Sequence, residues 1–75
     1  MLLENLIGTR FESIEDMITS LQREFDFTIE NYSDHLFAVD ESDNYGEIKI
    51  CYSFYYSLID SKYEIIGMTE GELVN

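Results

Sequence analysis

Apolar residues recur at alternating spacings of three and four in the first third of the chain. The stripe consists of Phe11, Ile14, Ile18, Leu21 and Phe25. This spacing predicts an amphipathic helix, because residues three and four apart lie on one helix face. Two capping boxes compete for its start, Thr9 with Glu12 and Ser13 with Asp16. We prefer Ser13, because the segment at Thr9 is equally compatible with extended chain.

Beyond the helix, which should end near Glu24–Asp26, the apolar period drops to two and predicts β-strands. The strands are expected over residues 27–30, 35–41, 47–56 and 62–69. Polar segments that favour turns separate them, at residues 31–34, 41–46 and 57–61. A short helix or ordered arm is expected in residues 1–8, and the tail from Glu70 onward is expected to fray.

These elements predict a single domain over residues 1–75 of the α+β class, with one main amphipathic helix packed on a three- to four-stranded antiparallel meander sheet. The helix should cover the sheet face made by Phe27, Ile29, Phe37, Val39, Ile48, Ile50, Tyr52 and Phe54. The other face would carry Leu36, Ala38, Cys51, Tyr55, Ile66 and Met68. On the last strand, Tyr63 and Ile65 would lie on the face opposite to that of Ile66 and Met68. That second face is too apolar for full solvation, so the N-terminal segment, a second subunit or a target is needed to cover it.

The composition is that of a folded chain rather than a disordered one. The sequence is 45% hydrophobic, contains six Tyr and five Phe, and has no Pro. A single cysteine, Cys51, excludes an internal disulfide framework and a multi-cysteine zinc site, and it fits a reducing cytosol. The first residues lack the basic segment of a secretory signal, and no apolar run reaches the length of a membrane span. We therefore expect a cytoplasmic protein.

Charge changes this picture more than any other property. Sixteen Asp and Glu face four Lys and Arg, which gives a formal net charge of −12. Such an excess destabilises a compact chain by self-repulsion. A basic partner would relieve it, whereas anionic lipid and nucleic acid would be repelled. The expected partner is a basic nucleic-acid-binding protein, with no direct contact to nucleic acid or membrane.

The densest acidic segment is the predicted hairpin loop Asp40–Glu47. Its carboxylates are Asp40, Glu41, Asp43 and Glu47, and Tyr45 is a candidate aromatic anchor. A calcium-binding EF-hand loop starting at Asp40 would need glycine at its sixth position and glutamate at its twelfth, where this chain has Tyr45 and Cys51. The loop is therefore either a solvated turn or a partner-binding tip, and no metal is expected.

A second acidic patch is expected on the first turn of the helix, at Glu12, Glu15 and Asp16. An outward charged face is ordinary for a soluble helix, but this one lacks the opposite sign apart from Arg23. Among the tyrosines, Tyr45 and Tyr55 are the candidates for exposed interface residues, since tyrosine is enriched at protein interfaces. We therefore add Glu12, Glu15, Asp16 and Tyr55 to the candidate partner-binding residues.

No catalytic constellation stands out. Sixteen carboxylates produce accidental pairs, and a domain of this size seldom encloses the pocket that general acid–base catalysis needs. His35 and Cys51 could form a nucleophilic pair, but the strand alternation puts them on opposite sheet faces. The sequence predicts a non-enzymatic protein without a cofactor.

The short, acidic, tyrosine-rich chain, with dense patches at Asp40–Glu47 and Glu12–Asp16, resembles the small inhibitors of bacteriophages and mobile elements: anti-CRISPR proteins and related DNA mimics. The resemblance covers the whole chain and rests on composition and layout. It implies a non-enzymatic inhibitor that blocks a CRISPR effector at the site where the effector recognises target DNA. If the protein is phage-encoded, as the resemblance implies, it would act in the host bacterial cytoplasm.

A second class of function stays open beside this one. The chain is also compatible with a small acidic interaction or regulatory subunit, such as an immunity protein against a basic nuclease or a homodimeric accessory protein. The apolar second sheet face favours a homodimer, whereas the charge disfavours one unless the interface avoids the acidic patches.

Overall fold

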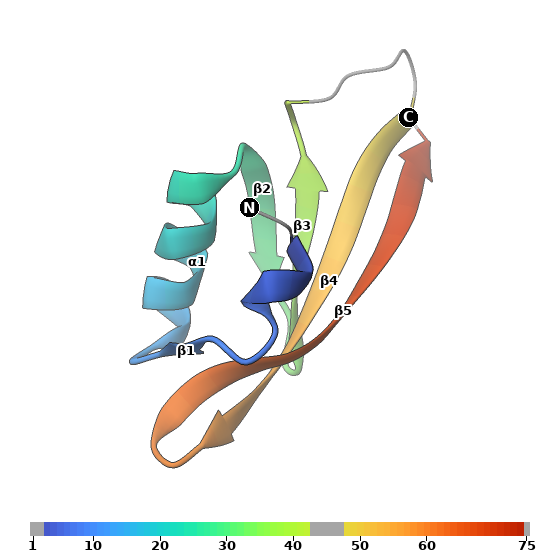
Figure 1. Cartoon of the computed structure of the whole chain (residues 1–75). Coiled ribbons are helices and arrows are strands. Elements are labelled where there is room, and N and C mark those ends of the chain that lie inside the picture. Colours follow the sequence, from blue (N-terminus) through green and yellow to red (C-terminus); the bar gives the residue numbers. More distant parts are fainter. Residues whose placement is uncertain (1–2, 43–47, 75) are drawn as a thin grey trace.

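The computed structural model describes residues 3–42 and 48–74 (Figure 1). The chain begins with a short 3₁₀ helix, η1 (Leu3–Leu6), strand β1 (Arg10–Phe11) and helix α1 (Ile14–Glu24). Four strands follow: β2 (Phe27–Asn31), β3 (His35–Asp40), β4 (Ile48–Ile59) and β5 (Lys62–Val74). All neighbouring strands pair antiparallel, in the order β1-β5-β4-β3-β2.

The fold is mostly β. Of the described residues, 57% lie in strands and 22% in helices, and the five-stranded sheet curls into a half-barrel. Helix α1 contacts β1 and β2, the two outermost strands, and so closes the open side of the curl (Figure 1). The predicted α+β architecture, a helix on a three- to four-stranded meander, is therefore wrong. A fifth strand at the N-terminal side, a β4 that continues to Ile59 and a β5 that continues to Val74 make the sheet the dominant element.

Helix α1 is confirmed where local signals defined it. Ser13 is the N-cap, and its Oγ accepts a hydrogen bond from the Asp16 N–H at 3.1 Å. The helix ends at Glu24, and the Phe25 N–H donates to the Leu21 carbonyl at 2.9 Å. Met17 and Leu21 are buried against the sheet, which is the face that the apolar stripe predicts.

The β4–β5 hairpin is longer than predicted at both ends. Its turn is only Asp60–Ser61, with φ angles of 52° and 65°, as in the two-residue turns that match the twist of paired strands. The tail does not fray, because Leu73 pairs with Lys49 and Val74 with Ile48. The predicted five-residue turn and frayed tail are therefore wrong.

A β-bulge at Ile66 bends this hairpin. Tyr56 pairs with Ile65 but Tyr55 pairs with Gly67, so Ile66 is an extra residue on β5. A bulge bends a strand and increases its twist, which suits the curl of β4 and β5 seen in Figure 1. It also shifts the alternation, so that Ile65 and Met68 both join the core instead of facing opposite sides as predicted.

The core lies on the concave side of the sheet. Its largest fully buried side chains are Met17, Leu21, Leu36, Phe54 and Ile65. On β3 the concave residues are Leu36 and Ala38, both 0% exposed, whereas Phe37 and Val39 lie half-buried on the outer face. The predicted core face of β3 is thus inverted. Both faces of this strand are apolar, and the concave side of a curled sheet leaves room for small Ala38 between Ile29 and Tyr52.

Candidate partner-binding surfaces

At the turn end of the hairpin, every cation is matched to carboxylates. We define the turn end as Arg10, Glu12, Asp60, Lys62 and Glu64. Arg10 Nε lies 2.8 Å from Glu64 Oε1, and its Nη1 lies 3.8 Å from Asp60 Oδ2. Lys62 Nζ lies 3.1 Å from Glu12 Oε1. Two cations thus serve three carboxylates, and the turn end neutralises most of its own charge.

The opposite end of the sheet is organised differently. We define the open end as Asp26, Asp40, Glu41, Lys49, Glu70 and Glu72, where β3 and β5 finish and β4 begins. Glu41 accepts from Lys49 Nζ at 2.6 Å and from Thr28 Oγ1 at 2.8 Å. The hydrogen bond from Lys49 and, to a smaller extent, the hydrogen bond from Thr28 lower the pKa of Glu41. The one lysine of the open end is therefore already engaged.

The other carboxylates of the open end have no cation in the part of the chain that the structure describes. Asp40 Oδ1 accepts from the Ser42 N–H at 2.9 Å and from the Ser42 hydroxyl at 2.6 Å, which are bonds within its own turn. Glu70 and Glu72 are exposed on β5, opposite Tyr52 and Ile50 of β4. Residues two apart on one strand face are about 6–7 Å apart, so these two glutamates form a short acidic row.

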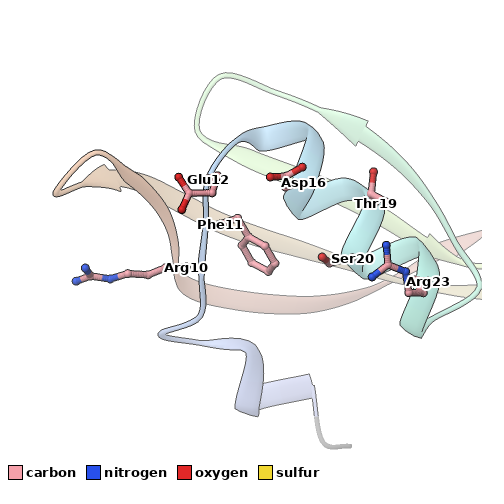
Figure 2. Close-up of a pocket in the computed structure, with 7 residues that line it drawn as sticks. All are labelled: Arg10, Phe11, Glu12, Asp16, Thr19, Ser20 and Arg23. Carbon is pink, nitrogen blue, oxygen red and sulfur yellow. The ribbon is translucent and has the colours of Figure 1, made fainter.

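Glu12 and Asp16 line an open pocket of about 370 Å³ between β1 and α1 (Figure 2). The pocket is also lined by Arg10, Phe11, Thr19, Ser20 and Arg23. Figure 2 shows Arg23 beside Ser20, with Glu12 at the other end of the pocket. Two of the four cationic side chains of the protein thus lie next to this acidic patch, and a basic partner would meet mixed charge here.

Tyr55 lies on the outer face of the sheet, in a row of rings that crosses three neighbouring segments. Its ring centroid is 5.3 Å from that of His35, which stacks on Tyr32 at 5.0 Å. Asp34 Oδ1 lies 2.7 Å from His35 Nδ1. Tyr32 donates to Glu30 at 3.0 Å, and this hydrogen bond to a carboxylate raises the pKa of Tyr32. The row lies toward the β2–β3 turn, away from the open end.

The candidate residues from the sequence therefore fall on three surfaces. Asp40 and Glu41 belong to the open end, and Tyr55 belongs to the outer sheet face. Glu12, Glu15 and Asp16 lie on the helix side, where Glu12 is also the residue of the turn end that pairs with Lys62. Asp43, Tyr45 and Glu47 lie outside the described residues. The structure does not bring the three described groups together into one site.

Glu70 and Glu72 were missed because the tail was expected to fray. Residues 68–73 show no alternation of apolar and polar side chains, because Met68 lies on the same strand face as the two glutamates. The two-residue turn at Asp60–Ser61 lets the tail continue the pairing with β4, and this pairing places both glutamates at the open end.

The single histidine and the single thiol do not form a pair. The prediction that they face opposite sides is wrong, since both His35 and Cys51 lie on the outer face. His35 pairs with Tyr55 and Cys51 with Val39, four positions further along β3, a separation of about 13 Å. Cys51 is buried. Within residues 3–42 and 48–74, no group of three or more His, Cys, Asp or Glu is placed to hold a metal ion.

Comparison with protein-family models, curated proteins and solved structures finds no match for this chain. Neither of the two described helices is long and apolar enough to cross a membrane.

Proposed function

We propose that this protein is a non-enzymatic inhibitor that binds a basic nucleic-acid-binding protein, most concretely a CRISPR effector, at the site that recognises DNA. Its carboxylates would take the place of DNA phosphates in front of the effector's lysines and arginines. It would act in the bacterial cytoplasm.

The observation that carries this proposal is the charge balance of the open end. One lysine stands against five carboxylates there, and that lysine is engaged by Glu41 at 2.6 Å. Asp40, Glu70 and Glu72 have no cationic partner among the described residues. Cations supplied by another protein would replace this repulsion with attraction, and the field would also speed the encounter.

The paired strands hold these carboxylates in fixed positions on the surface. Glu70 and Glu72 are held on a strand that pairs with β4 over its whole length, so their spacing is fixed before binding. A preorganised row loses less conformational entropy on association than charges on a loose tail would. A row of fixed carboxylates is the feature that a phosphate-binding surface can recognise.

The test is competition with DNA on purified effector–guide RNA complexes of several CRISPR types. Target-DNA binding is measured at increasing concentrations of this protein, at low and at high salt. We expect inhibition of at least one effector that added DNA reverses and that weakens with salt. A ternary complex of effector, DNA and this protein, or no effect on any effector, would contradict the proposal.

Matched charge reversals locate the surface. Asp40→Lys with Glu72→Lys should abolish inhibition, because it reverses two charges at the open end. Glu15→Lys with Glu30→Lys makes the same change in net charge at two exposed carboxylates elsewhere and should leave most of the inhibition. Equal losses in both double variants would show that net charge, not this surface, drives binding.

One observation favours the alternative, a small acidic interaction or regulatory subunit. Leu58 and Ile66 are 60% and 50% exposed, more than expected for large apolar residues on a solvated surface. A second copy or another subunit would bury them. Light scattering at low and high salt separates the two functions, because a dimer that persists unchanged at both salt concentrations supports the subunit and a monomer supports the inhibitor.

A further inference from the structure

Strand β5 is an edge strand along most of its length. On its outer side, β1 pairs only with Tyr63–Glu64. Next to that pair, the Gly8 N–H donates to the Ile65 carbonyl at 2.7 Å, and the Ile65 N–H donates to the Thr9 carbonyl at 3.0 Å. In the described chain, no strand pairs with residues 66–74 on that side. Figure 1 shows the red end of β5 as the outer boundary of the sheet. This free edge is about 27 Å long.

The pairing pattern shows which residues turn their backbone groups toward the free edge. The Tyr56 N–H donates to the Asp34 carbonyl at 3.2 Å, so the Tyr56 backbone faces β3. Backbone direction alternates along a strand, so the same holds for Phe54, Tyr52 and Ile50. The partners of these three residues on β5 are Met68, Glu70 and Glu72. Those partners therefore direct their N–H and C=O groups away from β4, to the free edge.

We infer that residues 66–74 of β5 bind an extended segment of a basic partner as an additional antiparallel strand. The backbone groups of Met68, Glu70 and Glu72 supply the hydrogen bonds. Lysine or arginine side chains of the added strand lie opposite the Glu70 and Glu72 carboxylates. The basic nature of the partner rests on the proposed function, whereas the use of the edge rests on the strand pairing alone.

Charge selects a basic segment over a second copy of this chain. Antiparallel pairing of two β5 edges over residues 68–74 would set Glu70 of each copy opposite Glu72 of the other. Like charges directly opposite each other on neighbouring strands are destabilising, whereas opposite charges stabilise the pair. A self-paired edge would concentrate four carboxylates, and a cationic strand would neutralise two.

The intervening positions of β5 define the rest of the added strand. A Cβ at Gly67 would have no heavy atom within 4 Å, and one at Gly71 would have Cys51 Sγ nearest, at 3.5 Å. The outer side of the edge is therefore uncrowded between the two glutamates. It has room for a bulky apolar residue between the two cations, which gives the pattern cation, apolar residue, cation.

The test uses a nine-residue peptide of alternating lysine and valine as the probe, with the full chain. We expect its binding to slow hydrogen exchange at the Met68, Glu70 and Glu72 amides. In antiparallel pairing, the residues opposite these three donate their own N–H groups to β5, and they are the lysines. Methylation of the lysine backbone nitrogens should therefore weaken binding about tenfold or more, because several hydrogen bonds are lost.

Methylation of the valine backbone nitrogens is the matched control. That peptide has the same charge and the same number of methyl groups, but its methyls point away from β5, so its affinity should be nearly unchanged. Equal affinity of both methylated peptides would overturn the inference, since binding by charge alone does not distinguish them. Loss with the valine-methylated peptide only would overturn the antiparallel arrangement.

A second set of variants tests the two glutamates. Glu70→Gln with Glu72→Gln should weaken binding of the unmodified peptide about tenfold, whereas Glu24→Gln with Glu30→Gln, at two exposed carboxylates away from β5, should change its affinity little. Because the peptide is used in place of the cellular partner, the experiment tests edge binding independently of the proposed function. Edge binding without any effect on CRISPR effectors would contradict only the proposed function, and inhibition of an effector without edge protection would contradict only this inference.

Discussion

The two ends of the β4–β5 hairpin use similar residues in opposite ways. At the turn end, Arg10 and Lys62 are paired with carboxylates of their own chain. At the open end, Lys49 is taken by Glu41, while Glu70 and Glu72 have no cation among the described residues. By the residues that define them, the turn end has two cations and three carboxylates, and the open end has one cation and five carboxylates. The turn end is therefore nearly neutralised by its own ion pairs, whereas the open end keeps an excess of negative charge that a basic partner would neutralise.

Both ends belong to one sheet, and a substitution at Phe54 tests whether they unfold cooperatively. Its side chain is 0% exposed and lies between the two ends. Phe54→Ala should lower the free energy of unfolding by about 3–5 kcal/mol, measured by urea denaturation. Amide exchange should accelerate at both ends together. Phe54→Leu is the milder variant should Phe54→Ala not fold, and acceleration at one end only would show two independent units.

Tyr56 tests whether the β2–β3 turn, which lies toward the turn end, can be loosened alone. Its hydroxyl lies 2.7 Å from Asn31 Oδ1 and 2.8 Å from the Tyr32 carbonyl. Tyr56→Phe should cost about 1–2 kcal/mol of unfolding free energy and speed exchange at the β2–β3 turn, with the open end unchanged.

The buried Tyr56 hydroxyl also predicts that the fold loses stability at alkaline pH. Burial raises the pKa of Tyr56, so its contribution to stability is fully present below about pH 10 and is lost as pH rises through the raised pKa. Thermal unfolding between pH 8 and 11 should show this loss in the wild type and a weaker one in Tyr56→Phe. Identical curves would contradict the assignment.

One charge reversal at each end should have opposite effects. Glu64→Lys removes the 2.8 Å pair with Arg10 and places two cations together, so unfolding free energy should fall by about 1 kcal/mol. Glu72→Lys relieves repulsion at the open end, so unfolding free energy should rise by about 0.3 kcal/mol. Both effects should shrink in 1 M salt. A change of the same sign in both variants would remove the distinction between the ends.

The smallest expected effect concerns the single ion pair of the open end. The hydrogen bond from Lys49 lowers the pKa of Glu41. Its contribution to stability is therefore present above the unfolded value of about 4.3 and is lost as pH falls through the lowered pKa. Glu41→Gln should reduce the acid dependence of unfolding between pH 5 and 2. An unchanged profile would mean that the pair contributes nothing measurable.

Local signals in the sequence predicted local structure well. Ser13 and the apolar stripe defined α1, because capping and helical spacing act within a few residues. Strand positions in the β2–β4 region were also close, since period-two patterns are local. Asp40 and Glu41, which were predicted to begin the hairpin loop, lie at the last residue of β3 and directly after it, and both are half-buried.

The predictions were wrong where contacts between residues far apart in the sequence determine the structure. Residues 35–39 are apolar on both strand faces, so only the curl of the sheet determines that Ala38 rather than Val39 is buried. The bulge at Ile66 and the pairing of the tail depend on β4 and not on the tail itself. Glu70 and Glu72 could not be assigned to the open end until that pairing was known, and the fifth strand depends on contacts across the whole chain.

The pairing of β1 with β5 has a consequence for biosynthesis. Strands β2 to β5 each pair with their neighbour in sequence, so they can assemble as successive hairpins. Arg10 and Glu64, in contrast, are 54 positions apart. Strand β1 therefore leaves the ribosome long before the residues of β5 with which it pairs. Until Tyr63 and Glu64 are synthesised, Phe11 has no partner strand, and the nascent chain is exposed to chaperones and to aggregation at this position.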